Sequence, residues 1–298
     1  MQPEDDVSDL LPTEATLFVP VGVEIQAVLV FSRHGLGQSM YGSDSWRVAA
    51  ARRCLALVEV DLRTESNGWP AHLAPEQAAI QLERVLDVLG DESGESTLAN
   101  APLITWGHSS GAYLWTTTGP FLADRLVAHI GFHGSAPVSL FQDDDESYPR
   151  VFGPTFLAVP GLFVLADQEP ASIRDRVIEQ VQVGRLYGAH WAVSLHQDAR
   201  HWDEIGSFEI IDAFVGHTLA MRLPENASQP LIPAIYDGGV LGVMDHRRDL
   251  DLELERLFDV QLYPADAKTR SYTTTSWLPN TTFADQWFET QVAQIGAQ

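Results

Sequence analysis

The chain has 298 residues, of which 45% are hydrophobic and 20% charged. This balance is typical of a globular protein that buries about three quarters of its unfolded surface. It excludes collagen-like, disordered and disulfide-scaffold classes, and no apolar run reaches the roughly 18–20 residues of a membrane span. The formal net charge is −23, from 41 acidic and 18 basic side chains. Because such a surface repels phosphate backbones, we expect no nucleic-acid partner.

Two residue types are used sparingly. Lys268 is the only lysine, and this pattern fits either a chain that stays hydrated at high salt or an ordinary acidic protein from a GC-rich genome. Cys54 is the only cysteine, which excludes an intramolecular disulfide and a cysteine-rich zinc site. We expect Cys54 to be an inert core thiol. The N-terminus lacks an export signal, so the chain as given is expected to be cytoplasmic, or secreted if a signal has been removed.

Short apolar segments alternate with amphipathic stretches along most of the chain. Strands that are apolar on both faces are typical of a parallel sheet covered by helices on both sides. The pattern therefore predicts an α/β fold with a mostly parallel sheet. The predicted strands are Ala15–Pro20, Glu24–Ser32, Cys54–Leu62, Pro102–Gly107, Val127–Phe132, Leu162–Ala166 and Trp191–His196, and the predicted helices are Pro75–Leu89, Gly111–Asp124, Ala171–Val183 and Ser207–Met221.

The alternation stops near Leu223. We divide the chain into an N-terminal arm (residues 1–14), a catalytic domain (15–222) and a C-terminal extension (223–298). The extension has several large aromatic side chains and two helix-like stretches, Asp249–Phe258 and Phe283–Ile295. We expect it to pack on the core, with a disordered arm as the alternative.

The strongest chemical signal is the pentapeptide Gly107-His108-Ser109-Ser110-Gly111, which matches G-x-S-x-G. It follows an apolar strand and opens a helix, which is the context that a nucleophile elbow requires. The sharp turn strains the backbone at Ser109, and the two glycines remove side chains that would collide there. The turn presents the hydroxyl at the carboxyl edge of the sheet, and we predict Ser109 as the nucleophile.

A serine hydroxyl needs a base, and the base needs a carboxylate that orients it. His201 lies in a loop after the last predicted strand, and Asp167 ends an earlier one. Together with Ser109 they occur in the order serine, acid, histidine. We therefore predict His201 as the base and Asp167 as its partner. We interpret Glu169, Asp198 and Asp203 as solvated loop carboxylates. No predicted strand precedes His72 or His246, and we interpret the other competing histidines as packed or surface residues: His129, His133, His190, His196 and His217.

The oxyanion of an acyl-transfer reaction needs backbone N–H donors. One is expected from Ser110, and the other from the loop Arg33–Gln38 after the second strand. Within this loop we favour the N–H of Leu36, with Gly37 next, and expect Arg33 and His34 to shape the loop. The residues expected to line the substrate site are Gly35, Gly37, His108 and Trp202, with core packing as the alternative for Trp202.

With these motifs in place, residues of about 15–222 resemble a serine hydrolase of the α/β-hydrolase superfamily, esterase-like in type. The resemblance implies hydrolysis of a small-molecule carboxylic ester by a Ser-His-Asp triad, with no metal and no other cofactor. A serine peptidase, a thioesterase or a non-catalytic ligand-binding relative are the alternatives. The 29 residues from His133 to Gly161 (161 − 133 + 1) allow only a small flap, which favours short or soluble esters. The oligomeric state is not indicated.

Overall fold

The computed structural model describes residues 14–62, 75–134, 147–196, 199–204, 207–226, 229–243, 261–264 and 275–293. A seven-stranded sheet lies at its centre in the order β1-β3-β2-β4-β5-β6-β7. The β1 strand is antiparallel to β3, and all the other neighbours are parallel. The strands are β1 (Glu14–Phe18), β2 (Ala27–Ser32), β3 (Leu55–Asp61), β4 (Leu103–His108), β5 (Leu126–Phe132), β6 (Gly161–Ala166) and β7 (Trp191–His196).

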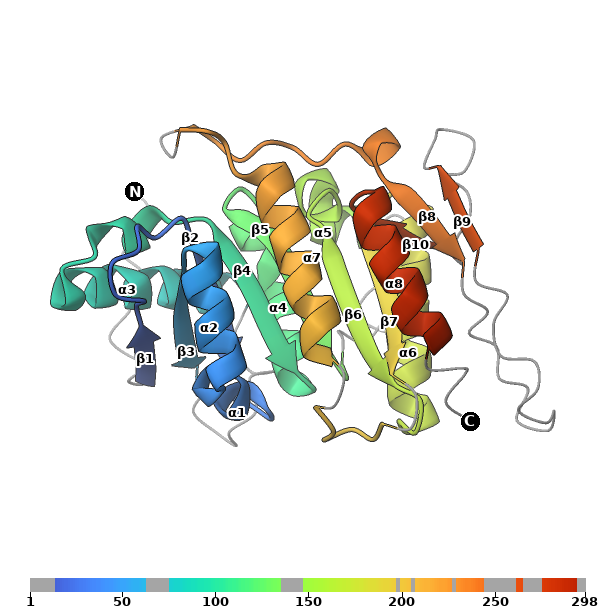
Figure 1. Ribbon diagram of the computed structural model, residues 1–298, viewed down its shortest axis with the longest axis horizontal. Coiled ribbons are helices and arrows are strands. Elements are labelled where there is room, and N and C mark those ends of the chain that lie inside the picture. The colour runs from blue at the N-terminus through green and yellow to red at the C-terminus, as the bar shows by residue number, and fades with distance from the viewer. Residues whose placement is uncertain are drawn as a thin grey trace.

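Helices cover both faces of this sheet. The helices α2, α7 and α8 lie on one face, and α3, α4 and α6 lie on the other (Figure 1). Because β2, β4 and β6 are buried at every position, their sequences are apolar almost throughout. The helices are α1 (Gly37–Gly42), α2 (Asp44–Arg53), α3 (Pro75–Ser93), α4 (Ser110–Leu122), α5 (Ser147–Leu157), α6 (Ala171–Leu186), α7 (Ser207–Arg222) and α8 (Thr281–Ala293), with short 3-10 turns η3 (Ser96–Asn100) and η5 (Tyr236–Gly238).

The predicted α/β fold is confirmed, and each predicted strand corresponds to a strand of the sheet. The sequence did not predict α1, α2 and α5, nor a second, three-stranded sheet in the order β10-β8-β9. The predicted helix Asp249–Phe258 lies outside the described residues. Among the described helices, none combines the length and apolarity that crossing a bilayer requires. The second sheet contains β8 (Val240–Val243), β9 (Gln261–Pro264) and β10 (Thr275–Leu278).

The prediction that Cys54 is a core residue was wrong. It is the C-cap of α2, in the left-handed conformation with φ 57°, and it is partly exposed rather than a core residue. A helix very often ends in this conformation because the next N–H can then bond to a free carbonyl of the last turn. The strand therefore starts one residue later, at Leu55.

The C-terminal segment covers the free edge of the main sheet. Side chains from β10 and α8 bond to backbone groups of β7 that point away from β6. Ser276 Oγ accepts from the Val193 N–H at 2.9 Å, Trp287 Nε1 donates to the Val193 oxygen at 2.8 Å, and Gln291 Oε1 accepts from the Leu195 N–H at 2.9 Å. An uncovered edge strand is prone to pair with other chains, so these bonds give the packed extension a structural role.

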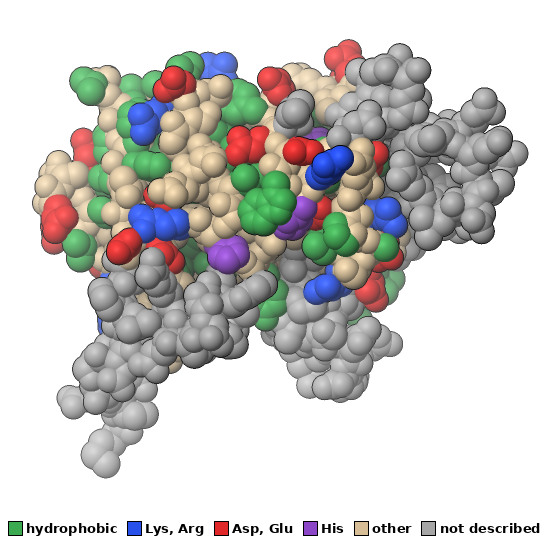
Figure 2. All heavy atoms as spheres, turned by 90° about the horizontal axis from the view of Figure 1, so that it is seen from below, with side chains coloured by type: hydrophobic (Ala, Val, Ile, Leu, Met, Phe, Trp, Pro, Cys, Tyr) green, Lys and Arg blue, Asp and Glu red, His purple; other side chains and the backbone are tan. Residues whose placement is uncertain are grey.

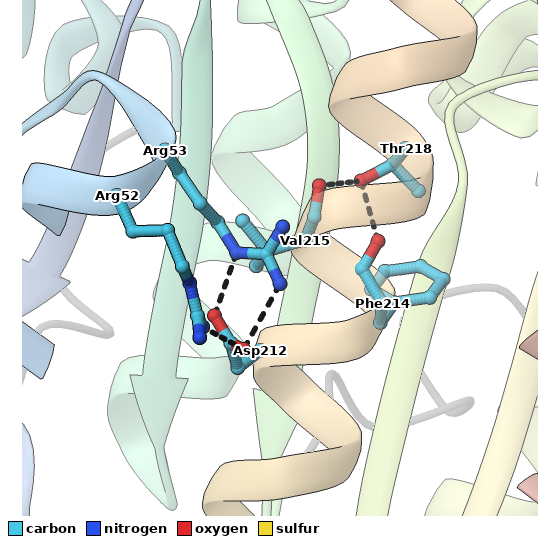
Figure 3. A network of polar contacts seen from close by, with 6 residues as sticks. All are labelled: Arg52, Arg53, Asp212, Phe214, Val215 and Thr218. Atoms are coloured by element: carbon cyan, nitrogen blue, oxygen red, sulfur yellow. Dashed lines mark hydrogen bonds and ion pairs between the residues drawn. The ribbon is translucent and has the colours of Figure 1, made fainter. Parts of the chain in front are cut away.

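Two helices on one face are tied by a shared carboxylate. Asp212 of α7 accepts from Arg53 of α2 at 2.6 and 2.9 Å, and from Arg52 at 2.5 Å (Figure 3). The Asp212 side chain is 12% exposed, that of Arg53 21% and that of Arg52 58%. A Cβ on Gly216 would lie 1.9 Å from Arg53 Nη1, so this glycine makes room for the guanidinium.

Asp212→Asn is expected to lower the free energy of unfolding by about 2 kcal/mol, less than for a fully buried pair because the arginines are partly hydrated. Arg52→Ala is the matched control and should cost at most about 0.5 kcal/mol, since an exposed ion pair contributes little. Urea unfolding followed by tryptophan fluorescence measures both. Equal losses of unfolding free energy in the two variants would show that the partly buried Arg53–Asp212 pair adds nothing beyond the exposed Arg52–Asp212 pair.

Candidate active site

The backbone at Ser109 has the strained conformation expected of a nucleophile elbow. Ser109 joins β4 to α4 with φ 56° and ψ −117°, a region that non-glycine residues rarely occupy. A Cβ on Gly107 would lie 2.2 Å from the Gly111 oxygen, and one on Gly134 would lie 2.4 Å from the Ser109 oxygen. The Ser109 N–H donates to the Phe132 oxygen at 2.9 Å. The turn is therefore fixed by close backbone packing that larger residues would prevent.

Backbone donors lie on both sides of Ser109. Ser110 is the first residue of α4, and its N–H has no acceptor within the helix because the first turn lacks preceding carbonyls. The loop after β2 lies on the other side, since β2 is the neighbour of β4. In this loop Leu36 is the N-cap of α1, and Gly35 has φ 68°. Ser110 and Leu36 thus both lie in turns that follow the carboxyl ends of neighbouring strands, β4 and β2.

The glycines of this loop are required by close contacts. A Cβ on Gly35 would lie 2.1 Å from His108 Nδ1, and one on Gly37 would lie 1.6 Å from the Ser32 oxygen. Arg33 shapes the loop as expected: its Nε donates to the buried Glu59 carboxylate at 2.9 Å, and it also pairs with Glu14. These contacts attach the loop to β3 and β1.

The carboxylate bonded to His201 is Glu169, whereas the sequence predicted Asp167. His201 Nδ1 donates to Glu169 Oε1 at 2.6 Å. The Glu169 side chain is fully buried, and that of His201 is 17% exposed. Glu169 is therefore not the solvated carboxylate that we expected. Because Nδ1 carries the proton that faces Glu169, the lone pair of a neutral His201 is on Nε2, the form that a base requires.

Two backbone bonds hold the turn after β6 beside the end of β7 and the loop that carries His201. The Asp167 N–H donates to the His196 oxygen at 2.8 Å, and the Gln168 N–H donates to the Ala199 oxygen at 3.0 Å. Asp167 is 8% exposed at the end of β6, and the next turn brings Glu169 to His201. Asp203 accepts from the Arg200 N–H at 2.8 Å, as expected of a loop carboxylate, and Asp198 lies outside the described residues.

Two further histidines, neither of them predicted as a site residue through this contact, bond to the backbone of His201. His108 Nε2 and His133 Nδ1 lie 2.7 and 2.8 Å from the His201 carbonyl oxygen. Since a carbonyl only accepts, both nitrogens are protonated donors. Burial lowers the pKa of both rings to about 3, so each is neutral at pH 7. Of these two histidines, His133 has an unusual backbone conformation, left-handed with φ 50°. A sequence does not reveal such a conformation.

The same three histidines have a spacing that could hold a metal ion, since their donor atoms lie within 4.8 Å of one another. A metal needs deprotonated nitrogens. His108 Nε2 and His133 Nδ1 carry protons bonded to the carbonyl, and His201 Nδ1 is bonded to Glu169. The protonated nitrogens His108 Nε2 and His133 Nδ1 therefore cannot ligate a metal in this arrangement, whereas His108 Nδ1 and His133 Nε2 are buried with no hydrogen-bond partner among the described residues.

Trp202 gives this edge an exposed aromatic surface. Its side chain is 61% exposed, and its ring centroid lies 4.8 Å from that of His108 and 5.1 Å from that of His201. On this face of the molecule, histidine and hydrophobic side chains lie together near the middle (Figure 2). His108, which we expected to line the substrate site, is instead fully buried.

The remaining described histidines are buried or partly buried, or contact neighbouring side chains. His190 stacks on Trp277 with centroids 4.4 Å apart, and His217 contacts Asn280 at 3.1 Å. His129 and His196 are buried in the core, and burial lowers the pKa of His129 to about 3 and that of His196 to about 4. His34 is partly buried, which lowers its pKa. His72 and His246 lie outside the described residues.

The strand order, the helices on both faces and the strained turn after β4 define an α/β-hydrolase fold. No protein-family model matches this chain, and no curated protein matches it. Among solved structures it is similar to esterase PE8, at 19% identity over 69% of this chain and 98% of that one, with a TM-score of 0.47. It is also similar to the thermophilic esterase Est2 of Thermogutta terrifontis, at 14% identity over 74% of this chain and 92% of that one, with a TM-score of 0.48. A third is XC6422 of Xanthomonas campestris, a lidless α/β serine hydrolase, at 14% identity over 73% of this chain and 93% of that one, with a TM-score of 0.46. None of these similarities bears on individual site residues.

Proposed function

We propose that this protein is a serine hydrolase that cleaves carboxylic esters through an acyl-enzyme intermediate. The observation that carries the proposal is a strained Ser109 elbow at the same edge of the sheet as His201 bonded to the buried Glu169. A serine hydroxyl becomes a competent nucleophile only beside a base that is itself oriented by a third group.

In the proposed reaction, Ser109 Oγ attacks the ester carbonyl while His201 Nε2 takes the hydroxyl proton. Glu169 holds the Nδ1–H and stabilises the imidazolium. The tetrahedral oxyanion accepts bonds from the N–H groups of Ser110 and Leu36, each worth roughly 3–4 kcal/mol to the barrier. The C–O bond then breaks, and His201 returns the proton to the leaving alcohol. Water repeats the sequence and releases the acid.

The proposed substrates are esters with short acyl chains. The connection between β5 and β6 is too short for a large helical cap, and Trp202 offers a flat apolar surface beside His201. This connection therefore offers little chain from which to build a long acyl tunnel. Hydrolysis of p-nitrophenyl acetate and butyrate should be faster than that of the decanoate.

The direct test labels the nucleophile. An alkyl fluorophosphonate is expected to stop ester hydrolysis in proportion to its incorporation, and peptide mapping should find one adduct, on Ser109. Ser109→Ala should take up no label, whereas Ser110→Ala keeps its backbone N–H and should still be labelled. An adduct elsewhere, or ester turnover that survives full labelling, would rule out this mechanism.

A further inference from the structure

His201 lies in a connection whose described part forms neither strand nor helix. Ten residues connect β7 to α7, from 197 to 206 (206 − 197 + 1), and the described part, residues 199–204, contains one turn, at residues 201–202. A catalytic base must be held to a fraction of an ångström, and a displacement of about 1 Å can cost about 10²-fold in rate. Something other than a β-ladder must therefore fix the His201 backbone.

The two imidazole donors described above meet this need. A carbonyl oxygen has two lone pairs, and here both are used, by His108 Nε2 and His133 Nδ1. The donors come from the ends of β4 and β5, which pair with each other through His108 and Phe132. His133 is anchored in turn, since its own N–H donates to the Val164 oxygen of β6 at 2.8 Å. The loop is thus attached to three central strands.

The same strands hold the nucleophile. His108 is the covalent neighbour of Ser109, and its ring centroid lies 4.6 Å from that of His201. On its other side, Nδ1 of His108 faces Gly35 of the loop with the Leu36 donor, where a Cβ would come within 2.1 Å. One buried ring therefore lies between the nucleophile, the base and the oxyanion loop.

We infer that His108 and His133 are positioning residues, which hold the His201 backbone so that its imidazole reaches Ser109. This inference rests on the proposed function. Neither ring takes part in proton transfer, because each uses its only proton in a buried bond to the carbonyl. Loss of one donor should therefore slow the chemical step and leave substrate binding nearly unchanged.

The test compares side chains that differ in the donor and little in size. Gln at position 108 places its amide N–H near the position of imidazole Nε2, and Met has the same length without a donor. We expect His108→Met to lower kcat about 10- to 100-fold with KM within about twofold, and His108→Gln to restore kcat to within about threefold of the wild type. At position 133 the pair is Asn, whose amide mimics Nδ1, and Gly, because both tolerate the positive φ.

Titration with diethyl p-nitrophenyl phosphate separates positioning from folding. The amplitude of p-nitrophenolate release counts competent sites, and the rate constant reports how well each site reacts. The inference expects an unchanged amplitude and a lower rate constant in His108→Met and His133→Gly, with the rate constant regained in His108→Gln and His133→Asn. An unchanged rate constant per competent site in the donor-free variants, whatever their amplitude, would overturn it. A wild type that releases no p-nitrophenolate would instead contradict the proposed function.

Discussion

Glu169→Gln is expected to lower kcat for p-nitrophenyl acetate by about 10³- to 10⁴-fold, with a much smaller change in KM. The comparable carboxylate-to-amide change in a serine-histidine-aspartate triad costs about 10⁴-fold. The reason is that an amide cannot stabilise the imidazolium that forms at His201, and its NH₂ group favours the wrong tautomer. The 2.6 Å bond from His201 Nδ1 to a fully buried carboxylate makes Glu169 the group on which this effect should fall.

Asp167→Asn is the matched control, because Asp167 lies two residues away and makes its backbone bond to His196 through the main chain. We expect it to change kcat by less than about 10-fold. Glu169→Asp keeps the charge on a shorter side chain and should fall between the two amide variants. A larger loss of kcat in Asp167→Asn than in Glu169→Gln would show that Asp167, the residue predicted from the sequence, is the carboxylate that orients His201. Urea unfolding of each variant shows whether a loss of rate reflects a loss of stability.

The two-residue difference between Asp167 and Glu169 shows where sequence patterns lose precision. A pattern locates the end of β6 because the apolar run ends there, and an acid that follows a strand is the natural candidate. Which side chain reaches His201 depends on the turn after the strand. The bonds from the Asp167 N–H to His196, at the end of β7, and from the Gln168 N–H to Ala199 set that turn. These are contacts between residues about 30 positions apart, and no local pattern reports them.

The fold was predictable where burial requires a continuous run of apolar residues. Strands β2 to β7 are buried on both faces, so their apolar runs mark them within a few residues. Helix α2 was not predicted, because it contacts the core through alanines and Trp46 and has almost no apolar stripe. The roles of His108 and His133 were not predicted because no local pattern reports them: both rings are buried, and only the three-dimensional course of the loop that carries His201 brings them to one carbonyl.

Below pH 6.5 the free energy of unfolding is expected to fall steeply, because four buried histidines resist protonation in the folded state. Burial lowers the pKa of His108, His129 and His133 to about 3 and that of His196 to about 4. In the unfolded chain the same groups bind a proton near pH 6.5. Between about pH 6.5 and the folded pKa values the unfolded state therefore binds more protons, and linkage requires that stability be lost as the pH falls.

The size of this loss makes it measurable. One pKa unit corresponds to about 1.4 kcal/mol, so at pH 5.5 the four groups together cost about 5 kcal/mol, a large part of the stability of a typical domain. Protonation of the 41 acidic side chains relieves repulsion and acts in the opposite direction, but mainly below pH 5. The range from pH 7.5 to 5.5 therefore isolates the histidines. Urea unfolding in this range, repeated in 1 M NaCl to screen surface charge, measures the slope.

His129→Leu tests the assignment at a position away from the active site, where the ring lies between Phe156, Phe163 and Trp191. Removing one buried imidazole should reduce the stability lost between pH 7.5 and pH 5.5 by about 1.4 kcal/mol. At pH 7.5 the variant should be at least as stable as the wild type, because His129 Nε2 is buried with no hydrogen-bond partner among the described residues and an unsatisfied polar atom is costly. A flat pH dependence in the wild type, or an unchanged slope in the variant, would show that buried imidazoles do not control the acid stability of this fold.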